Sequence, residues 1–158
     1  MRYFLLDKIV AFEPGQRARG VKCVSWTDEV LHDHFPDHPM LPGALLIEAM
    51  SQLGGFLVEL SFHTAGQPVR RAVLTQIQEA KFHHACVPGD RIELETELAA
   101  RLESAARVVA TAGVEGRKVA RAELTFVLRE VDSARVHEQR RDIYRVWTRD
   151  LTPQPVIP

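Results

Sequence analysis

Cysteine is scarce in this sequence, and charge of neither sign dominates it. The 158 residues include two cysteines, Cys23 and Cys86, which are too few for a disulfide framework and do not form a CxxC pair. The 20 Lys and Arg residues nearly balance 21 Asp and Glu residues, for a formal net charge of −1. This balance excludes a strongly basic nucleic-acid binder as the default class. We therefore expect reduced thiols, a cytoplasmic location and no nucleic-acid partner.

Several targeting and cofactor signals are also missing. The first ten residues, MRYFLLDKIV, lack the apolar core of a signal peptide. The apolar stretch 44–47 is interrupted by Glu48, and no run approaches the roughly 20 residues of a membrane span. The GxGxxG and GxxxxGK(S/T) phosphate loops and the GxSxG nucleophile elbow are absent. These absences exclude a membrane span and the common nucleotide-binding and α/β-hydrolase signatures.

The apolar content of 46% and charged content of 26% are ordinary for one soluble domain. Extended segments are predicted at 4–12 and 18–26, on either side of a Pro14-Gly15 turn. Apolar and polar residues then alternate, or apolar residues run together, in four later segments: 72–82, 92–98, 107–114 and 120–128. Alternation with one polar face indicates an antiparallel sheet that is open to water on one side.

One helix is predicted between these groups of strands, from Gly43 to about His63. It is apolar on nearly every face, too short and too polar at Glu48 for lipid, and therefore a core helix. Gly54 and Gly55 each cost a helix about 1 kcal/mol relative to Ala, which indicates close approach of another backbone. The sequence thus predicts an α+β fold in which a sheet curls around one central helix.

The pattern changes after Glu130. A second amphipathic helix is predicted from about 133 to 148. Its apolar face carries Val136, Ile143, Tyr144 and Trp147, and its opposite face is predicted to carry Arg140, Arg141 and Arg145. The proline-containing segment 151–158 cannot continue this helix. We therefore divide the chain into a domain at 1–130 and a C-terminal extension at 131–158.

The segment from 27 to 52 contains the residues suited to catalysis. His34 lies in a proline-stiffened loop, and Gly43 begins the central helix, where free N–H groups and the helix dipole can polarise a carbonyl. Glu48 lies about one and a half turns inside, where an apolar environment disfavours ionisation. An imidazole beside a protonated carboxyl is an acid–base pair suited to neutral pH.

Other interpretations of these residues are open at this point. Glu48 can be a buried structural carboxyl that Gln52 satisfies one turn later, and His34 can be a packing residue. Two groups of side chains could instead bind a metal ion: His32, His34 and His38 with Asp33 and Asp37, and His83 and His84 with Cys86. Neither spacing matches a well-defined zinc pattern, so we expect no metal.

Three separated motifs resemble those of a known family. They are His34-Phe-Pro-x-His-Pro-x-x-Pro-Gly43-x-Leu-x-x-Glu48-Ala-Met-x-Gln52, the opening segment Phe4-Leu-Leu-Asp-Lys-Ile-Val10, and Ala80-Lys-Phe82 followed by Val87-Pro-Gly-Asp90. Together they resemble the β-hydroxyacyl-acyl-carrier-protein dehydratases, the FabZ/FabA group of hot-dog folds, over about residues 1–130. The sheet-around-helix fold expected from the strand and helix patterns agrees with this resemblance.

The resemblance implies a β-elimination that needs no cofactor. His34 would remove the α-proton of a 3-hydroxyacyl thioester, and Glu48 would protonate the departing hydroxyl. The N–H of Gly43 would bind the thioester carbonyl, and Gln52 would orient Glu48. Because position 48 is Glu and not Asp, the chain resembles the simple dehydratase branch, which implies a trans-2-enoyl product without isomerisation.

The resemblance also implies partners. In the family the histidine and the acid meet across a homodimer interface, and dimers can assemble further into trimers of dimers. The substrate is carried as a phosphopantetheine thioester on an acidic acyl-carrier protein, which basic residues near the tunnel mouth would attract. Arg70, Arg71 and Lys81 are candidates for that role.

The chain departs from the family pattern in two regions. Asp33 and Asp37 stand where glycines often occur, and their carboxylates should favour a protonated His34. The extension 131–158 exceeds the usual length. These departures leave three alternatives: a dehydratase of a specialised pathway such as polyketide or aryl-polyene synthesis, a hot-dog thioesterase, and a non-catalytic subunit that binds acyl thioesters.

Overall fold

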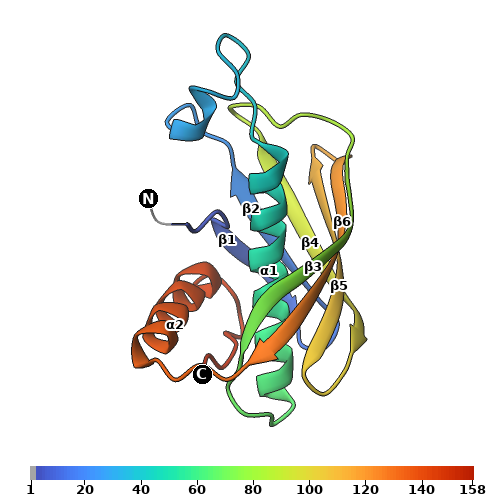
Figure 1. Ribbon diagram of the computed structural model, residues 1–158. Coiled ribbons are helices and arrows are strands. Elements are labelled where there is room, and N and C mark those ends of the chain that lie inside the picture. Colours follow the sequence, from blue (N-terminus) through green and yellow to red (C-terminus); the bar gives the residue numbers. More distant parts are fainter. Residues whose placement is uncertain (1–2) are drawn as a thin grey trace.

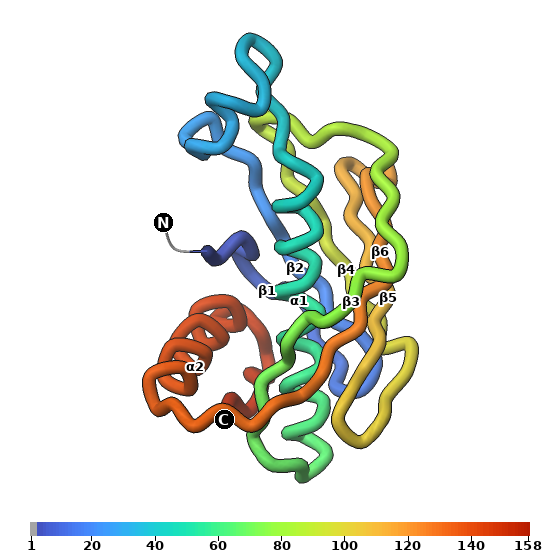
Figure 2. The backbone as a smooth tube through the Cα atoms, in the orientation of Figure 1, coloured from blue at the N-terminus to red at the C-terminus, as the bar shows by residue number. Residues whose placement is uncertain are grey.

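An antiparallel sheet curls around one long helix, and a second helix covers part of the side that the sheet leaves open (Figure 1 and Figure 2). The structure, a computed structural model, describes residues 3–158. Its elements are β1 (Lys8–Glu13), β2 (Arg17–Cys23), a short 3-10 helix η1 (Glu29–Leu31), α1 (Gly43–Thr64), β3 (Arg71–Phe82), β4 (Arg91–Arg101), β5 (Ala105–Val114), β6 (Arg117–Arg129) and α2 (Ala134–Thr148).

The six strands are ordered β1-β2-β4-β5-β6-β3, and every neighbouring pair is antiparallel. On β5 and β6 the buried residues alternate with more exposed ones, so one face of the sheet packs on α1. β1 and β3 are the two edges of the sheet. The predicted α+β fold, a sheet wrapped around a central helix, is confirmed.

Helix α1 supplies the core of the molecule. It is long and apolar enough to cross a membrane, but 78% of its most apolar window is buried inside the fold, so it is the core helix expected from the sequence. A Cβ on Gly54 would lie 3.1 Å from both the Phe126 ring and a Val108 methyl, and a Cβ on Gly55 would make only ordinary contacts. The prediction that a backbone approaches both glycines is therefore wrong, because the atoms nearest to both belong to side chains, and only those at Gly54 are unusually close.

The N-terminal strands are shorter than predicted. β1 begins at Lys8 and not at Phe4, and β2 ends at Cys23 and not at Trp26, whose side chain is 70% exposed. The polar Lys22, which interrupts the alternation of the sequence, is buried because its ammonium group finds oxygen partners in the following loop. The pattern of apolar residues alone could not predict this partner.

Helix α2 packs on β1 and on the N-terminal segment. The Ser133 side chain caps its start by accepting a hydrogen bond from the Val136 N–H. Tyr144 and Trp147 are buried; the Tyr144 ring meets Phe56 of α1 edge-on with 5.1 Å between centroids. Arg145 is exposed as predicted. Arg140, predicted to lie on the outer face, is half-buried on the inner face, and that prediction is wrong.

Candidate active site

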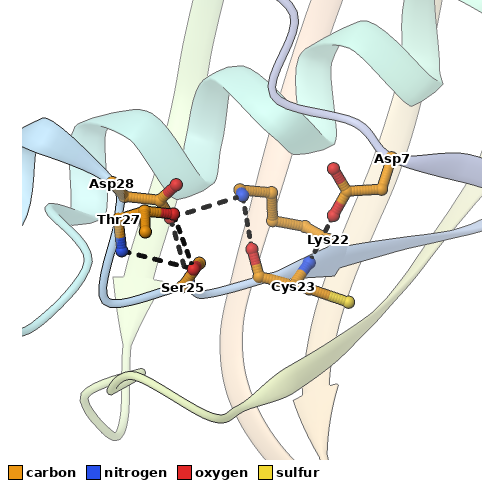
Figure 3. A network of polar contacts seen from close by, with 6 residues as sticks. All are labelled: Asp7, Lys22, Cys23, Ser25, Thr27 and Asp28. Carbon is orange, nitrogen blue, oxygen red and sulfur yellow. Dashed lines mark hydrogen bonds and ion pairs between the residues drawn. The ribbon is translucent and has the colours of Figure 1, made fainter.

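The loop that carries His34, residues 24–42, is fixed where it leaves β2. Six residues form the polar network there, as Figure 3 shows: Asp7, Lys22, Cys23, Ser25, Thr27 and Asp28. The Cys23 N–H donates to the Asp7 carboxylate, and the Lys22 ammonium donates to the Cys23 carbonyl. The Ser25 N–H donates to Asp28 Oδ2 at 3.1 Å, and Lys22 Nζ lies 3.8 Å from the same oxygen. The network therefore sets the direction in which the loop departs from the sheet.

A second set of contacts holds both ends of the loop to the turn before β4. The Val24 N–H donates to the Asp90 carbonyl at 3.0 Å, and the Gly89 N–H donates to the Val24 carbonyl at 3.0 Å. At the far end, the Leu41 N–H donates to the Cys86 carbonyl at 2.8 Å. The turn at 86–90 thus positions both the start of the loop and its return to α1.

His34 is held in a defined orientation inside this loop. Its ring Nδ1 lies 3.0 Å from the Met40 carbonyl oxygen, and its own carbonyl accepts the Met40 N–H at 2.8 Å. A carbonyl oxygen can only accept, so Nδ1 carries a hydrogen, and in the neutral ring the lone pair is on Nε2. The ring also stacks on Phe35, with 4.2 Å between centroids. These contacts fix the orientation of the imidazole, with Nε2 as the basic nitrogen of its neutral form.

The two aspartates near His34 differ in backbone role. Asp37 has a φ of 60°, the left-handed conformation that glycine adopts readily and that Asp tolerates better than most residues. Asp33 and Asp37 are both exposed, and within residues 3–158 neither forms an ion pair with the His34 ring. Asp37 therefore holds a backbone conformation that glycine would adopt more readily.

Gly43 leaves the first N–H of α1 free. The N–H groups of Leu45 and Leu46 donate to the Pro42 carbonyl at 3.0 and 3.1 Å, whereas that of Gly43 donates to no group in the part of the chain that the structure describes. A Cβ at this position would lie 2.8 Å from the Phe82 ring, so a larger residue would displace that ring. The free N–H lies at the positive end of the helix dipole, where it can bind a carbonyl oxygen.

Glu48 and Gln52 form a hydrogen-bonded pair one helical turn apart. Gln52 Nε2 donates to Glu48 Oε1 at 3.0 Å and to the Tyr3 carbonyl at 2.8 Å. Gln52 Oε1 accepts the N–H groups of Leu5 at 2.9 Å and Leu6 at 3.3 Å. The amide therefore fixes the acid and ties the N-terminal segment to α1, which accounts for the irregular course of the chain before β1.

Glu48 opens onto a cavity of about 560 Å³. The cavity is lined by α1 residues Glu48, Ser51, Gln52 and Gly55, by residues of β3, β6 and the N-terminal segment, and by four residues of α2. His34 and Gly43 do not line it, and the loop that carries His34 projects beyond the N-terminal end of α1 (Figure 1). One chain thus brings Glu48 and Gln52 together and leaves His34 and Gly43 outside their cavity.

The structure also shows how the candidate metal ligands and the candidate carrier-binding residues are arranged. Among residues 3–158 no group of three or more His, Cys, Asp or Glu side chains is arranged to hold a metal ion. Arg71 is 3% exposed, with Nη1 2.9 Å from Glu59 Oε2, so the prediction of a surface carrier-binding role for it is wrong. Arg70 lies over the Phe62 ring, and Lys81 is exposed and paired with Glu79.

One buried polar cluster was missed by the sequence reasoning. Glu59 accepts hydrogen bonds from Arg71 Nη1 and from the Ala72 N–H, each at 2.9 Å. Arg71 Nη2 lies 2.8 Å from Nδ1 of His137, whose Nε2 lies 2.7 Å from the Val131 carbonyl oxygen. Glu59 is 4% exposed, whereas Glu48 is only half-buried. A second carboxylate within the apolar helix was the available signal, because such a charge needs a buried partner.

The fold and these side chains define a hot-dog protein with an acid on its central helix. Among solved structures, a dehydratase heterocomplex ApeI:P from Xenorhabdus doucetiae matches with a TM-score of 0.67 at 17% identity, over 81% of this chain and 84% of that one. A hot-dog-like protein from Thermanaerovibrio acidaminovorans matches with a TM-score of 0.60 at 21% identity, over 89% and 94%. At these identities the likeness shows the fold alone.

Sequence comparison identifies the family. The FabA-like domain matches residues 1–123. The 3-hydroxyacyl-acyl-carrier-protein dehydratase FabZ of Exiguobacterium sibiricum is 36% identical over 127 residues, which are 80% of this chain and 89% of that protein. The enzyme of the same name from Clostridium acetobutylicum is 37% identical over 125 residues, or 78% and 86%. The chain belongs to the FabZ-type dehydratase family.

Proposed function

We propose that this protein dehydrates 3-hydroxyacyl thioesters on an acyl-carrier protein to trans-2-enoyl thioesters. The observation that carries the proposal is the pair of oriented groups: an imidazole with a free Nε2 and a carboxyl that Gln52 holds at a cavity. Acyl binding alone needs neither group. The relatives named above are dehydratases of such thioesters by name.

The chemistry follows from the roles that each group can take. His34 Nε2 removes the proton on the α-carbon, and the Gly43 N–H stabilises the negative charge that develops on the thioester oxygen. The α–β double bond forms as the β-carbon–oxygen bond breaks, and Glu48 transfers its proton to the departing hydroxyl, which leaves as water. The proton on His34 then returns to Glu48 through solvent, which restores both groups.

A second copy of the chain completes this site in our proposal. His34 and Glu48 of one chain do not share a cavity, so the imidazole must come from elsewhere. β3 is an edge strand, and Val73 and Ile77 on it are 46% and 47% exposed. An edge strand with exposed apolar side chains is suited to pairing with another strand. We therefore place two equivalent sites in a homodimer paired through β3.

The carrier remains the acyl-carrier protein in this proposal, as in the names of the relatives. Arg70 and Lys81 stay candidates for attracting its acidic surface, since both keep at least part of their side chains in solvent. Arg71 is excluded from that role by its burial.

The direct test is hydration of an enoyl thioester, followed by loss of enoyl absorbance. We expect His34→Ala and Glu48→Gln each to lower kcat by about 100-fold or more, the range of one general acid or base. Equal rates in the parent and both variants would contradict the assignment. Acyl-thioester affinity without turnover would favour the non-catalytic binding subunit, and release of free thiol would favour the thioesterase.

A mixing experiment tests whether the site is shared. His34→Ala and Glu48→Gln chains are co-expressed with different tags, so that about half of the randomly assembled dimers are mixed. Each mixed dimer has one site with both groups intact, so the pool should recover about one quarter of the parent activity. Activity no higher than that of the separate variants would place both groups in one chain.

A further inference from the structure

Helix α2 forms one wall of the cavity onto which Glu48 opens. Val136, Gln139, Arg140 and Tyr144 line the cavity together with Glu48, Gln52 and Gly55 of α1. Helix α2 spans 134–148 and so lies outside the segment that matches the family domain, 1–123. The wall is thus a feature of this chain added to the shared fold, at the place where a substrate bound to Glu48 would extend.

A positive charge stands in the middle of that wall. Val136, Arg140 and Tyr144 follow one another at intervals of four residues, so they share one face of α2. The neighbours of Arg140 on this face are half-buried or buried, and Arg140 itself is half-buried. A guanidinium group therefore replaces the apolar side chain that would normally fill the centre of an inward-facing stripe.

Within residues 3–158, Arg140 has no acidic partner. It forms no ion pair and no side-chain hydrogen bond there, although Glu138 and Asp142 are close in sequence. The nearby buried acid, Glu59, is already bound by Arg71 and the Ala72 N–H. A half-buried guanidinium without a counter-ion favours an anion that can enter its cavity.

We propose that Arg140 binds a carboxylate at the far end of the acyl chain, so that the enzyme prefers 3-hydroxyacyl thioesters that end in a carboxylate. This inference rests on the proposed dehydratase function. The planar guanidinium fork binds a carboxylate through two parallel hydrogen bonds. Along α1 the lining residues run from Glu48 to Gly55, about 10 Å at 1.5 Å per residue, which suits an acyl chain of medium length.

Substrate pairs of equal length test this preference. The pair is 3-hydroxysuberyl-pantetheine, which ends in a carboxylate, and 3-hydroxyoctanoyl-pantetheine, which ends in a methyl group. We expect the parent to show a kcat/KM about tenfold or more higher for the suberyl substrate. Arg140→Met should lower kcat/KM for the suberyl substrate by about tenfold or more and leave the octanoyl value within about twofold. Arg140→Lys should restore part of the preference, because it keeps the charge but loses the fork.

Arg145→Met is the matched control, because Arg145 is exposed on the same helix and does not line the cavity. It should leave both substrates unchanged. Equal kcat/KM for the two substrates in the parent would overturn the proposal, as would an Arg140→Met variant that lowers both values alike. The pantetheine arm carries no phosphate. A loss seen only with coenzyme A or acyl-carrier substrates would therefore assign Arg140 to the phosphate of the carrier and also overturn the proposal.

A binding measurement separates this inference from the dehydratase function. Suberyl-pantetheine and octanoyl-pantetheine lack the 3-hydroxyl and cannot react, so calorimetry reports affinity alone. Tighter binding of the suberyl compound to the parent, lost in Arg140→Met, supports the carboxylate site even if no substrate turns over. Turnover of both substrates without any difference in affinity would refute the carboxylate site and leave the dehydratase function standing.

Discussion

At the scale of single residues, Gln52 shows how one side chain can organise the site. Its amide oxygen accepts two backbone N–H groups, and its amide nitrogen donates to the Tyr3 carbonyl and to Glu48 Oε1. All strong hydrogen-bonding positions of the amide are filled, so rotating it by 180° would set donors against donors. Within residues 3–158, Glu48 Oε2 accepts no hydrogen bond, so it is the oxygen that would carry the proton in the proposed reaction.

Cys86 gives a prediction at the same scale. Burial and the nearby Asp90 charge raise the pKa of the Cys86 thiol from 9.0 to about 11. Between these values the unfolded chain loses the thiol proton and the folded chain keeps it. We therefore expect the Cys86 contribution to stability to be constant below pH 9 and to decrease as the pH rises towards 11.

Urea unfolding at several pH values measures this effect. Cys86→Ala should show a shallower fall in unfolding free energy over that range than the parent, apart from a constant offset for the lost packing. Cys23→Ala is the matched control, because the Cys23 side chain is exposed, and its curve should run parallel to that of the parent. A Cys86→Ala curve parallel to the parent would contradict the assigned pKa.

At the scale of elements, a buried polar network joins three parts of the chain. Glu59 of α1 binds Arg71 of β3, and Arg71 contacts His137 of α2. Burial also raises the pKa of Tyr144 well above its ordinary value, with the negative charge of Glu59 as a further cause. The phenol therefore stays neutral beside this network. Helix α2 is thus held to α1 and β3 by this polar network as well as by its aromatic residues.

Removing the carboxylate of Glu59 should destabilise the protein strongly. Glu59→Gln leaves Arg71 charged and buried without a counter-ion, a change that typically costs about 3–5 kcal/mol. The control is Glu93→Gln, whose ion pair with Arg91 is exposed on both sides and should contribute much less to stability. Urea unfolding compares the two variants. Similar losses of stability in both would show that the buried network contributes no more than a surface pair.

Much of the fold was predictable because the helix and strands indicated by the local patterns are all consistent with one fold. The apolar residues of α1 and the alternation of β5 and β6 indicated the wrapped sheet, which the structure confirms. The spacing of His34, Gly43, Glu48 and Gln52 predicts the proposed site, and that assignment stays a prediction. Tertiary partners could not be read from the same patterns. Arg140 was assigned to the outer face of α2 because charged residues usually face solvent, whereas the structure places it at a cavity next to Glu48.

At the scale of the whole molecule, the single chain presents the two halves of the proposed site at separate places. The His34 loop extends past the start of α1 (Figure 1), and the Glu48 cavity lies beside β3 and α2. In the dimer that we propose, a twofold interface brings different surfaces of each chain to its partner reciprocally, so the two halves would form two complete sites. Under this proposal, dehydration requires the dimer.

Blocking the β3 edge should therefore abolish both dimer formation and dehydratase activity. Ile77→Lys puts a charge on the exposed edge strand, and we expect a monomer by light scattering and loss of dehydratase activity. Val10→Lys is the matched control, since Val10 is 41% exposed on β1, the opposite edge. It should keep the mass and activity of the parent. An Ile77→Lys variant of unchanged mass would rule out pairing through β3.

The cavity beside Glu48 is complete only when the last helix of the described chain is present. Its walls include Tyr3 and Phe4 near one end of the sequence and α2 near the other, and domains begin to fold from the N-terminal side during synthesis. A nascent chain that has reached only the end of β6 contains α1 and all six described strands but not α2. Such a chain lacks Arg140, so the proposed preference for acyl chains that end in a carboxylate would begin only after α2 has left the ribosome.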